Sequence, residues 1–474
     1  MTNRRAFLAW TFWAVAATLL ALGGSTHAEK RRFEQEREAH ALRLSPATAL
    51  RGLRAYLAND WDLLRAHSYA SALLGRPYSS SYVKPRGDWE ADFRAGVMAD
   101  PDAAPIASAG RPLIPYRDFW VEYPPGFFLF AVPPALVAPD AASYRIAFSL
   151  LAAALLTAAL VLVQALVTRL AGASRSAWLP AWAAVCVLAL GPVVMNRSDA
   201  PVAFLVTAAV WAAVVGRPGL SGAALGLAIA TKLLPVVLLP PLLLRWVRGT
   251  GRPAAVRGLV ALGLAAIAPV LPFLATAGLS LSDALGYQSM RPLQIETSAA
   301  AVLGLLHAAL GTPLRAIQSF GSLNLQGPGV GLATALTSIQ MFVAVVGVWL
   351  WDRKADRDAT DSASSILLPL TTLATLAVCF VTAKVFSPQY LLWLLPLGVG
   401  LSRLAGWLSV LLLVACLLLS QLIFPISYDA LSALAGWAFS LVAVRNILLV
   451  VWVGSLVGRL TAKAQAIVPS TRKS

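Results

Sequence analysis

Residues 142–168 read ASYRIAFSLLAAALLTAALVLVQALVT, an apolar run with one charged side chain, Arg145. An α-helix of about 20 such residues spans roughly 30 Å, the thickness of the hydrocarbon core of a bilayer. Comparable runs recur along the chain. The sequence therefore predicts an all-α, polytopic membrane protein rather than a set of soluble domains.

The composition agrees with this fold class. The chain has 474 residues, of which 58% are hydrophobic and 13% are charged, whereas about a quarter of the residues in soluble domains are charged. The net charge of +16 does not indicate a nucleic-acid partner, because the basic residues are scattered between apolar segments and form no single basic face with interleaved aromatic residues. Basic cytoplasmic loops account for the charge.

Twelve spans are predicted, within a range of 11–13, in one transmembrane domain that covers residues 1–474. The first is 6–24, where Arg4 and Arg5 place the N-terminus in the cytoplasm. A retained helix is favoured there, and a cleaved signal peptide ending near residue 28 is the alternative. The other predicted spans are 142–168, 177–195, 199–215, 219–231, 234–246, 256–275, 329–351, 365–385, 390–402, 405–424 and 434–457.

On this topology residues 25–125 form a large extracytoplasmic first loop, and 464–474 form a cytoplasmic tail. Within the loop, 48–74 has helical apolar spacing and 79–110 is rich in Pro, Gly, Ser and Asp. Segments 126–137 and 298–312 are too short to cross unaided, so re-entrant or interfacial helices are expected there. The short external loops hold fewer basic residues than the cytoplasmic ones, which is typical of a protein of the plasma membrane with both termini inside.

Residues 219–246 favour a tight hairpin. Arg217 stands before this stretch and Arg245 lies at its end, so both ends are expected on the cytoplasmic side. The tip then falls at residues 231–232 on the external side, where Pro235 helps to break the helix.

No metal ion and no cofactor are expected. Cys186, Cys379 and Cys416 all lie inside apolar runs, without the Cys/His spacing of a zinc site or a Cys-x-x-Cys pair. No glycine-rich nucleotide motif occurs in a strand–turn–helix setting.

Ionisable residues at membrane depth are costly and are usually functional. In this chain they collect on the predicted external side, and the cytoplasmic junctions show mostly scattered arginines. The pattern predicts an external site with carboxylates and several cations. Its members are Asp62, Asp118, Glu122, Arg197, Asp199, Lys232, Arg291, Glu296 and Lys384.

Two carboxylates of this set lie in PYRDFWVEYPPGFF, residues 115–128. If the segment is helical, its spacing of four places Asp118 and Glu122 on one face. The following Tyr123 and two prolines would hold Glu122 rigidly, in a position suited to a general base for an acceptor hydroxyl. A charged loop cap beside a proline turn is the alternative.

The cations have similar alternatives. Lys232, alone in ATKLLPVVLLPP, either binds a lipid phosphate or snorkels to the headgroups. Arg291 suits bidentate phosphate recognition, and it either pairs with Glu296 or lines the site with it. Asp199 either caps the following helix or belongs to the site.

The segment that begins at Lys384 starts a span with polar residues beside aromatic ones. Gln389 and Tyr390, in SPQYLLW, either bind substrate or form part of an aromatic belt.

Five strings in the chain resemble those of the GT-C superfamily of integral membrane glycosyltransferases, in particular bacterial polyprenyl-phosphate-mannose-dependent mannosyltransferases. They are PYRDFWVEYPPG, NRSDAPVAFLVTAAVWAAV, GAALGLAIATKLLPVVLLP, MRPLQIETSA and FSPQYLLWLLPL, in this order.

The resemblance implies an all-helical enzyme that moves a sugar, commonly mannose, from a polyprenyl-phosphate donor to a lipid or glycan acceptor outside the membrane, with inversion. It also implies a carboxylate base in the first external loop, commonly in a D-L-x-x-Y pattern. The closest match, DLLRAHSYASALLGRPY, points to Asp62 and departs at Ala66, where the family often has tyrosine. Asp60, Asp118 and Glu122 are rival candidates for the base.

In this interpretation Lys232 and Arg291 hold the donor phosphate. Two other classes compete with it: a transporter or flippase of lipid-linked saccharides, for which the chain shows no convincing internal repeat, and a non-enzymatic assembly or polymer-binding partner, for which Lys232 would be dispensable. The expected substrate-binding residues are Tyr123, Asp199, Glu296, Lys384, Gln389 and Tyr390.

Overall fold

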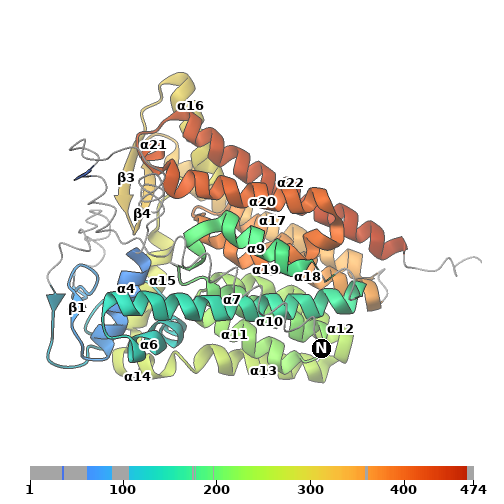
Figure 1. The fold of residues 1–474 in the computed structure, drawn as a ribbon, viewed down its shortest axis with the longest axis horizontal. Coiled ribbons are helices and arrows are strands. Elements are labelled where there is room, and N and C mark those ends of the chain that lie inside the picture. Colours follow the sequence, from blue (N-terminus) through green and yellow to red (C-terminus); the bar gives the residue numbers. More distant parts are fainter. Residues whose placement is uncertain are drawn as a thin grey trace, which may run out of the picture.

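A computed structural model describes residues 35–36, 61–87, 106–172, 176, 178–195, 197–357 and 361–466. The predicted first span, Asp60 and residues 467–474 of the predicted tail lie outside this part of the chain. The described body is helical, as predicted, and its long helices lie side by side (Figure 1).

Five helices of the described part are long and apolar enough to cross a membrane. They confirm a polytopic membrane protein, and they match the predicted spans 142–168, 329–351, 365–385, 405–424 and 434–457. Their bounds are α7 (Ala141–Ala171), α17 (Val330–Arg357), α18 (Asp361–Thr382), α20 (Trp407–Gln421) and α22 (Gly436–Ala466).

Among the described residues, the six other predicted spans correspond to shorter or broken helices, so the number twelve is not confirmed. A helix of 15 residues rises only about 22 Å, which is less than the hydrocarbon thickness. These shorter elements are α9 (Leu179–Leu190), η2 (Gly191–Val194), α10 (Ala200–Val214), α11 (Pro218–Thr231), η3 (Leu234–Leu238), α12 (Leu239–Thr250), η5 (Pro388–Tyr390) and α19 (Leu391–Ala405).

The predicted span 256–275 is interrupted. Helix α13 (Arg252–Ile267) is followed by α14 (Leu271–Ala277), η4 (Gly278–Leu281) and α15 (Ser282–Met290), and the two parts are bent by 43°. Pro269 and Pro272 stand at the bend, where each removes a backbone donor that a continuous helix needs.

The predicted hairpin is present around Lys232. Helix α11 ends at Thr231, Lys232 is extended (φ −149°, ψ 132°), and Pro235 lies in the first turn of η3. The Trp246 Nε1 donates to Ser221 Oγ at 3.1 Å, which brings the end of α12 beside the start of α11. The Lys232 break therefore lies at the opposite end of this unit.

Helices α11 and α13 approach so closely that glycine is required between them. A Cβ on Gly222 would collide with the backbone of Gly258 on α13. Small residues at helix crossings allow this kind of packing in membrane proteins. The contact supports the unit that carries Lys232.

Short elements gather at one end of the helices, to the left in Figure 1. They include α4 (Trp61–Leu73), which is the described part of the predicted loop helix, and two short helices that match the predictions for 126–137 and 298–312. The elements of this end are α4, η1 (Pro125–Phe127), α6 (Phe128–Val137), α14, α15, α16 (Ser298–Leu310), η6 (Leu422–Ile426) and α21 (Tyr428–Ser432).

Two small antiparallel sheets at this end depart from the predicted all-α class. One pairs β1 (Tyr78–Ser79) with β2 (Ile106–Ala107), and the other pairs β3 (Arg315–Ser319) with β4 (Ser322–Gln326). The hairpin of β3 and β4 turns at Phe320 and Gly321, both with positive φ (50° and 64°). Such short strands lack a hydrophobic period long enough to be detected from sequence.

Gly222→Val is expected to lower the free energy of unfolding by about 1–3 kcal/mol, because the α11–α13 contact has no space for a side chain. Thermal melting of the detergent-purified protein measures this effect. Gly263→Ala is the matched control, since a Cβ there meets no atom within 4 Å. Equal melting temperatures for Gly222→Val and the wild type would contradict the packing.

Candidate active site

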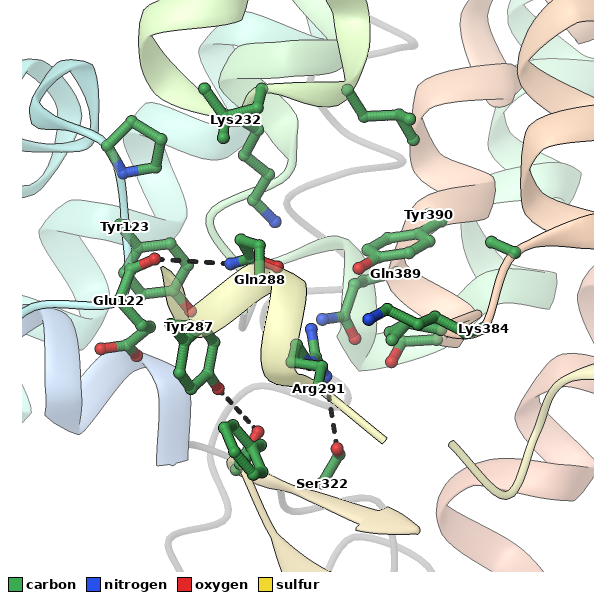
Figure 2. Close-up of a pocket in the computed structure, with 18 of the residues that line it drawn as sticks. Glu122, Tyr123, Lys232, Tyr287, Gln288, Arg291, Ser322, Lys384, Gln389 and Tyr390 are labelled. Atoms are coloured by element: carbon green, nitrogen blue, oxygen red, sulfur yellow. Dashed lines mark hydrogen bonds between the residues drawn. The ribbon is translucent and has the colours of Figure 1, made fainter. Parts of the chain in front are cut away.

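A cavity of about 510 Å³ lies at the end of the molecule where the short elements gather. Its walls come from α4, residues 122–124, the break at 232–237, the end of α15, the β3–β4 turn, one face of α17 and residues 383–393. Figure 2 shows Glu122 and Tyr123 on one side of this cavity and Lys384, Gln389 and Tyr390 on the other. Segments far apart in the sequence thus meet at one site.

Eight of the predicted site residues line this cavity. They are Asp62, Glu122, Tyr123, Lys232, Arg291, Lys384, Gln389 and Tyr390. Asp118, Arg197, Asp199 and Glu296 are not among the lining residues.

Asp62 lies in the first turn of α4, with its Oδ2 3.1 Å from Nη1 of Arg197. Burial by itself raises the pKa of Asp62, but the charges of Arg197, Arg65 and Lys232 together lower it below its ordinary value. The carboxyl group is therefore ionised near neutral pH and able to accept a proton.

Glu122 is more tightly held than Asp62. Its Oε1 accepts from Nη1 of Arg65 at 2.5 Å and its Oε2 accepts from the Tyr69 hydroxyl at 2.7 Å. Its side chain is 3% exposed, against 19% for Asp62. Both oxygens of Glu122 thus serve protein donors, which suits an anchor for Arg65 better than a proton acceptor for substrate.

Asp118 and Glu122 do not share a helix face, because residues 114–122 form turns and bridges instead of a helix. Tyr116 has a φ of 67°, which a helix cannot contain. Asp118 lies outside the cavity, and hydrogen bonds from Arg117, the Ile114 backbone and Arg111 hold its pKa well below its usual range. These hydrogen bonds hold residues 111–118 of the loop together.

Lys232 is fixed at the break after α11 by a carboxylate and three rings. Its Nζ lies 2.7 Å from Oδ1 of Asp199, which also accepts from Nε1 of Trp393 at 2.7 Å. The ammonium lies 5.8–6.0 Å from the ring centroids of Tyr123, Tyr390 and Trp393. Asp199 occupies the N-cap position of α10 without a capping hydrogen bond, so its side chain orients Lys232 instead.

Arg291 and Lys384 make only neutral hydrogen bonds among the residues that the structure describes. Nη2 of Arg291 donates to Ser322 Oγ at 3.2 Å, and Nζ of Lys384 donates to the Ser289 carbonyl at 2.6 Å. Burial and the charge of Arg291 lower the pKa of Lys384. Two adjacent cations without a carboxylate partner form a place for an anion.

Of the two alternatives for Arg291 and Glu296, the ion pair is not formed, and only Arg291 lines the cavity. Glu296 is 2% exposed and accepts from Nε2 of Gln294 at 2.9 Å, behind the cavity wall. Burial raises the pKa of Glu296 to about 7, against the charges of Arg445 and Arg197, which lower it. The residue supports the wall and does not face the cavity.

Sequence reasoning missed several residues of the site. Arg65 follows Asp62 by three positions on one helix, a spacing that places both on the same face and was a usable signal. Tyr287, whose hydroxyl donates to the Phe320 carbonyl at 2.6 Å, and Ser322 had no such signal, because only the tertiary fold brings the β3–β4 turn to α15. With Arg65, the lining has four cations and two carboxylates, an excess that favours an anionic ligand.

The helices and the cavity define a polytopic membrane protein with a site for an anionic ligand at one end. Comparison with known families then identifies it: residues 120–383, more than half of the chain, match the model of Glycosyltransferase family 87. The chain belongs to this glycosyltransferase family, which confirms the resemblance to GT-C membrane glycosyltransferases found in the sequence. Glu122, Lys232 and Arg291 lie inside the matched region, and Asp62 and Lys384 lie outside it.

The chain is also similar to two crystal structures of ArnT from Cupriavidus metallidurans. One is bound to undecaprenyl phosphate, with 14% identity, a TM-score of 0.41, and 85% of this chain and 74% of that chain covered. The other is in the apo state, with 13% identity, a TM-score of 0.39, and 84% and 72% covered. No curated protein matches the chain.

The lowered pKa of Asp62 predicts a pH-dependent stability difference. The ionised Asp62 side chain stabilises the folded state at pH values above 3.8, the ordinary pKa of this carboxyl group. This contribution is lost as the pH falls through the lower pKa that Asp62 has in the folded protein. The wild type should therefore gain stability over Asp62→Asn as the pH rises through this range. Melting temperatures of both proteins across acidic pH measure it, and a difference that does not depend on pH would contradict the ion pair.

Proposed function

We propose that this glycosyltransferase moves a sugar, mannose by its sequence resemblance, from a polyprenyl-phosphate donor to a lipid or glycan acceptor, with inversion. The observation that carries the proposal is one cavity lined by the Asp62 carboxylate, which is paired with Arg197, and by two cations, Arg291 and Lys384, that have no carboxylate partner among the described residues. The charge pattern of the loops supports an extracytoplasmic site at the plasma membrane.

The donor phosphate is assigned to Arg291 and Lys384, with Lys232 nearby. A guanidinium binds phosphate oxygens through two parallel hydrogen bonds, and an ammonium adds a compact charge. Lys232 is already neutralised by Asp199, so it contributes a fixed hydrogen-bond donor more than a net charge. Gln389 lines the same cavity as Arg291 and is assigned as an additional neutral donor.

The prenyl chain is assigned to the apolar side of the same cavity. Val236 and Val237 of η3 and Met341 of α17 line it, and Val236 is 49% exposed. Helix α17 also exposes Ile339 and Phe342 on its outer surface. Apolar surface that continues from a charged cavity to the outside of the helices suits a lipid with an anionic head.

Asp62 is assigned as the general base. The acceptor hydroxyl oxygen attacks the anomeric carbon while the bond to the phosphate oxygen breaks, and Asp62 takes the hydroxyl proton. The polyprenyl phosphate leaves with its charge held by Arg291 and Lys384. Because the transition state is like an oxocarbenium ion, the hydroxyl becomes acidic as it bonds, and a carboxylate of low pKa is a sufficient base.

Asp62→Asn is expected to reduce sugar transfer on the order of a hundredfold or more, because the amide cannot accept the proton. Membranes containing each variant, incubated with radiolabelled polyprenyl-phosphate mannose, measure the transfer, with protein amount checked by immunoblot. Asp118→Asn is the control and should keep its activity, since Asp118 lies outside the cavity. Full transfer by Asp62→Asn would rule out this base. Movement of lipid-linked saccharide across the membrane without any transfer would favour a flippase.

Arg291→Gln and Lys384→Gln are each expected to raise the KM for the donor about tenfold or more, because a charged hydrogen bond to phosphate contributes roughly 1.5–3 kcal/mol. The KM for the acceptor should change little. Steady-state kinetics with varied donor and varied acceptor separate the two effects. Lys354→Gln, at an exposed position of α17, is the matched control for loss of a positive charge. A donor KM unchanged in both cavity variants would refute the phosphate assignment.

A further inference from the structure

Arg445 is a fully buried cation in the middle of a membrane-spanning helix. It lies on α22 in the apolar run LVAVRNILLVV, residues 441–451, and is 0% exposed. It is not among the residues that line the cavity. A charge at such a position is costly, so its contacts indicate what it does for the protein.

The guanidinium of Arg445 contacts two chain segments that carry cavity residues. Its Nη2 donates to the backbone carbonyl of Glu296 at 2.7 Å, and its Nε donates to Oδ1 of Asn446 at 2.8 Å. Its Cζ lies 4.1 Å from the ring centroid of Phe386, a close cation–π contact. One side chain thus holds both the 291–297 segment and the 383–390 segment.

These two segments are also joined to each other through Gln294. Its backbone N–H donates to the Lys384 carbonyl at 2.9 Å, and its Oε1 accepts from the backbone N–H of Phe386 at 2.7 Å. Its Nε2 donates to Ser387 Oγ at 2.8 Å and to Glu296 at 2.9 Å. Arg291 begins the first segment and Lys384 lies in the second, so this network sets how far apart the two cations lie.

The neighbouring Asn446 extends the same network to the helix ends. Its Nδ2 donates to Ser298 Oγ at 3.1 Å, and Ser298 donates to the Val381 carbonyl at 2.7 Å. The start of α16 and the end of α18 are thereby fixed to α22. The 291–297 segment, which carries Arg291, precedes α16, and the 383–390 segment, which carries Lys384, follows α18. Both helix ends are tied to Asn446 through Ser298.

We propose that Arg445 is a positioning residue for donor recognition, which acts through Glu296 and Phe386 to hold Arg291 and Lys384 at the spacing of one phosphate group. This inference rests on the proposed function for its ligand. An apolar residue would fill the same space at lower cost. Nη1 of Arg445 and Oε1 of Glu296 have no hydrogen-bond partner within the described part of the chain, so the network is not optimised for stability alone.

The first test needs no substrate. Hydrogen–deuterium exchange of the full-length protein in nanodiscs is compared between the wild type, Arg445→Gln and Ser402→Ala. Ser402→Ala is the matched control. It removes the buried hydroxyl that accepts from Nε1 of Trp452 at 2.8 Å; Trp452 lies on α22, as Arg445 does, and neither Ser402 nor Trp452 lines the cavity. Arg445→Gln should speed exchange in segments 291–297 and 383–390, and the control should not. Unchanged exchange in both segments overturns the proposal. If Arg445→Gln does not fold, Arg445→Lys, which keeps the charge and loses the second hydrogen bond, replaces it.

The second test uses undecaprenyl phosphate as the probe and measures its Kd for the purified protein. Arg445→Gln should weaken binding about tenfold, and combination with Lys384→Gln should weaken it less than the product of the two single effects, as expected for residues in one network. Arg445→Lys should restore part of the affinity. Independent, multiplicative effects would overturn the proposal. Failure of the wild type to bind the probe or to transfer sugar would refute the proposed function instead, and the exchange experiment would still decide the role of Arg445.

Discussion

The ion pair between Lys232 and Asp199 is the interaction on which the rest of the site depends. Its 2.7 Å contact joins the break after α11 to the start of α10, and the Trp393 indole adds α19 through the same carboxylate oxygen. A lone ammonium in an apolar body must find a partner. Because it finds Asp199, the consecutive helices α10 and α11 and the distant helix α19 are held around one cavity with the lysine facing it.

The charges around this cavity fall into two groups with different physical roles. Glu122 with Arg65, and Asp199 with Lys232, are paired within the protein and give the walls their geometry. Arg291 and Lys384 have neutral partners among the described residues, so their positive charges are not neutralised by the protein and can attract an anionic ligand. Preorganised charges of this kind stabilise a leaving group without reorganisation during the reaction. Asp62 shares properties of both groups: it is paired with Arg197, and its side chain is more accessible than that of Glu122.

Much of the architecture was predictable because a bilayer imposes a strong sequence pattern. The five long apolar helices and the break at Lys232 follow from hydrophobic length and proline placement. The failures have physical causes. Asp118 and Glu122 have helical spacing in a segment that turns at Tyr116, and the strands β3 and β4 are too short for a periodic signal. Arg445, a lone charge inside an apolar run, was a usable signal that the prediction missed, but the run does not show which loops its side chain reaches.

The sequence by itself determined that the chain is a helical membrane protein with ionisable residues near the ends of its apolar runs, since each apolar run must avoid water and a charge in lipid is costly. Only the tertiary structure decided which of those charges are neutralised and which face the cavity. Asp118 was removed from the site, and Arg65 and Ser322 were added to it. The reason is that pairing depends on distances of a few ångströms between segments far apart in the chain, and local sequence pattern does not encode those distances.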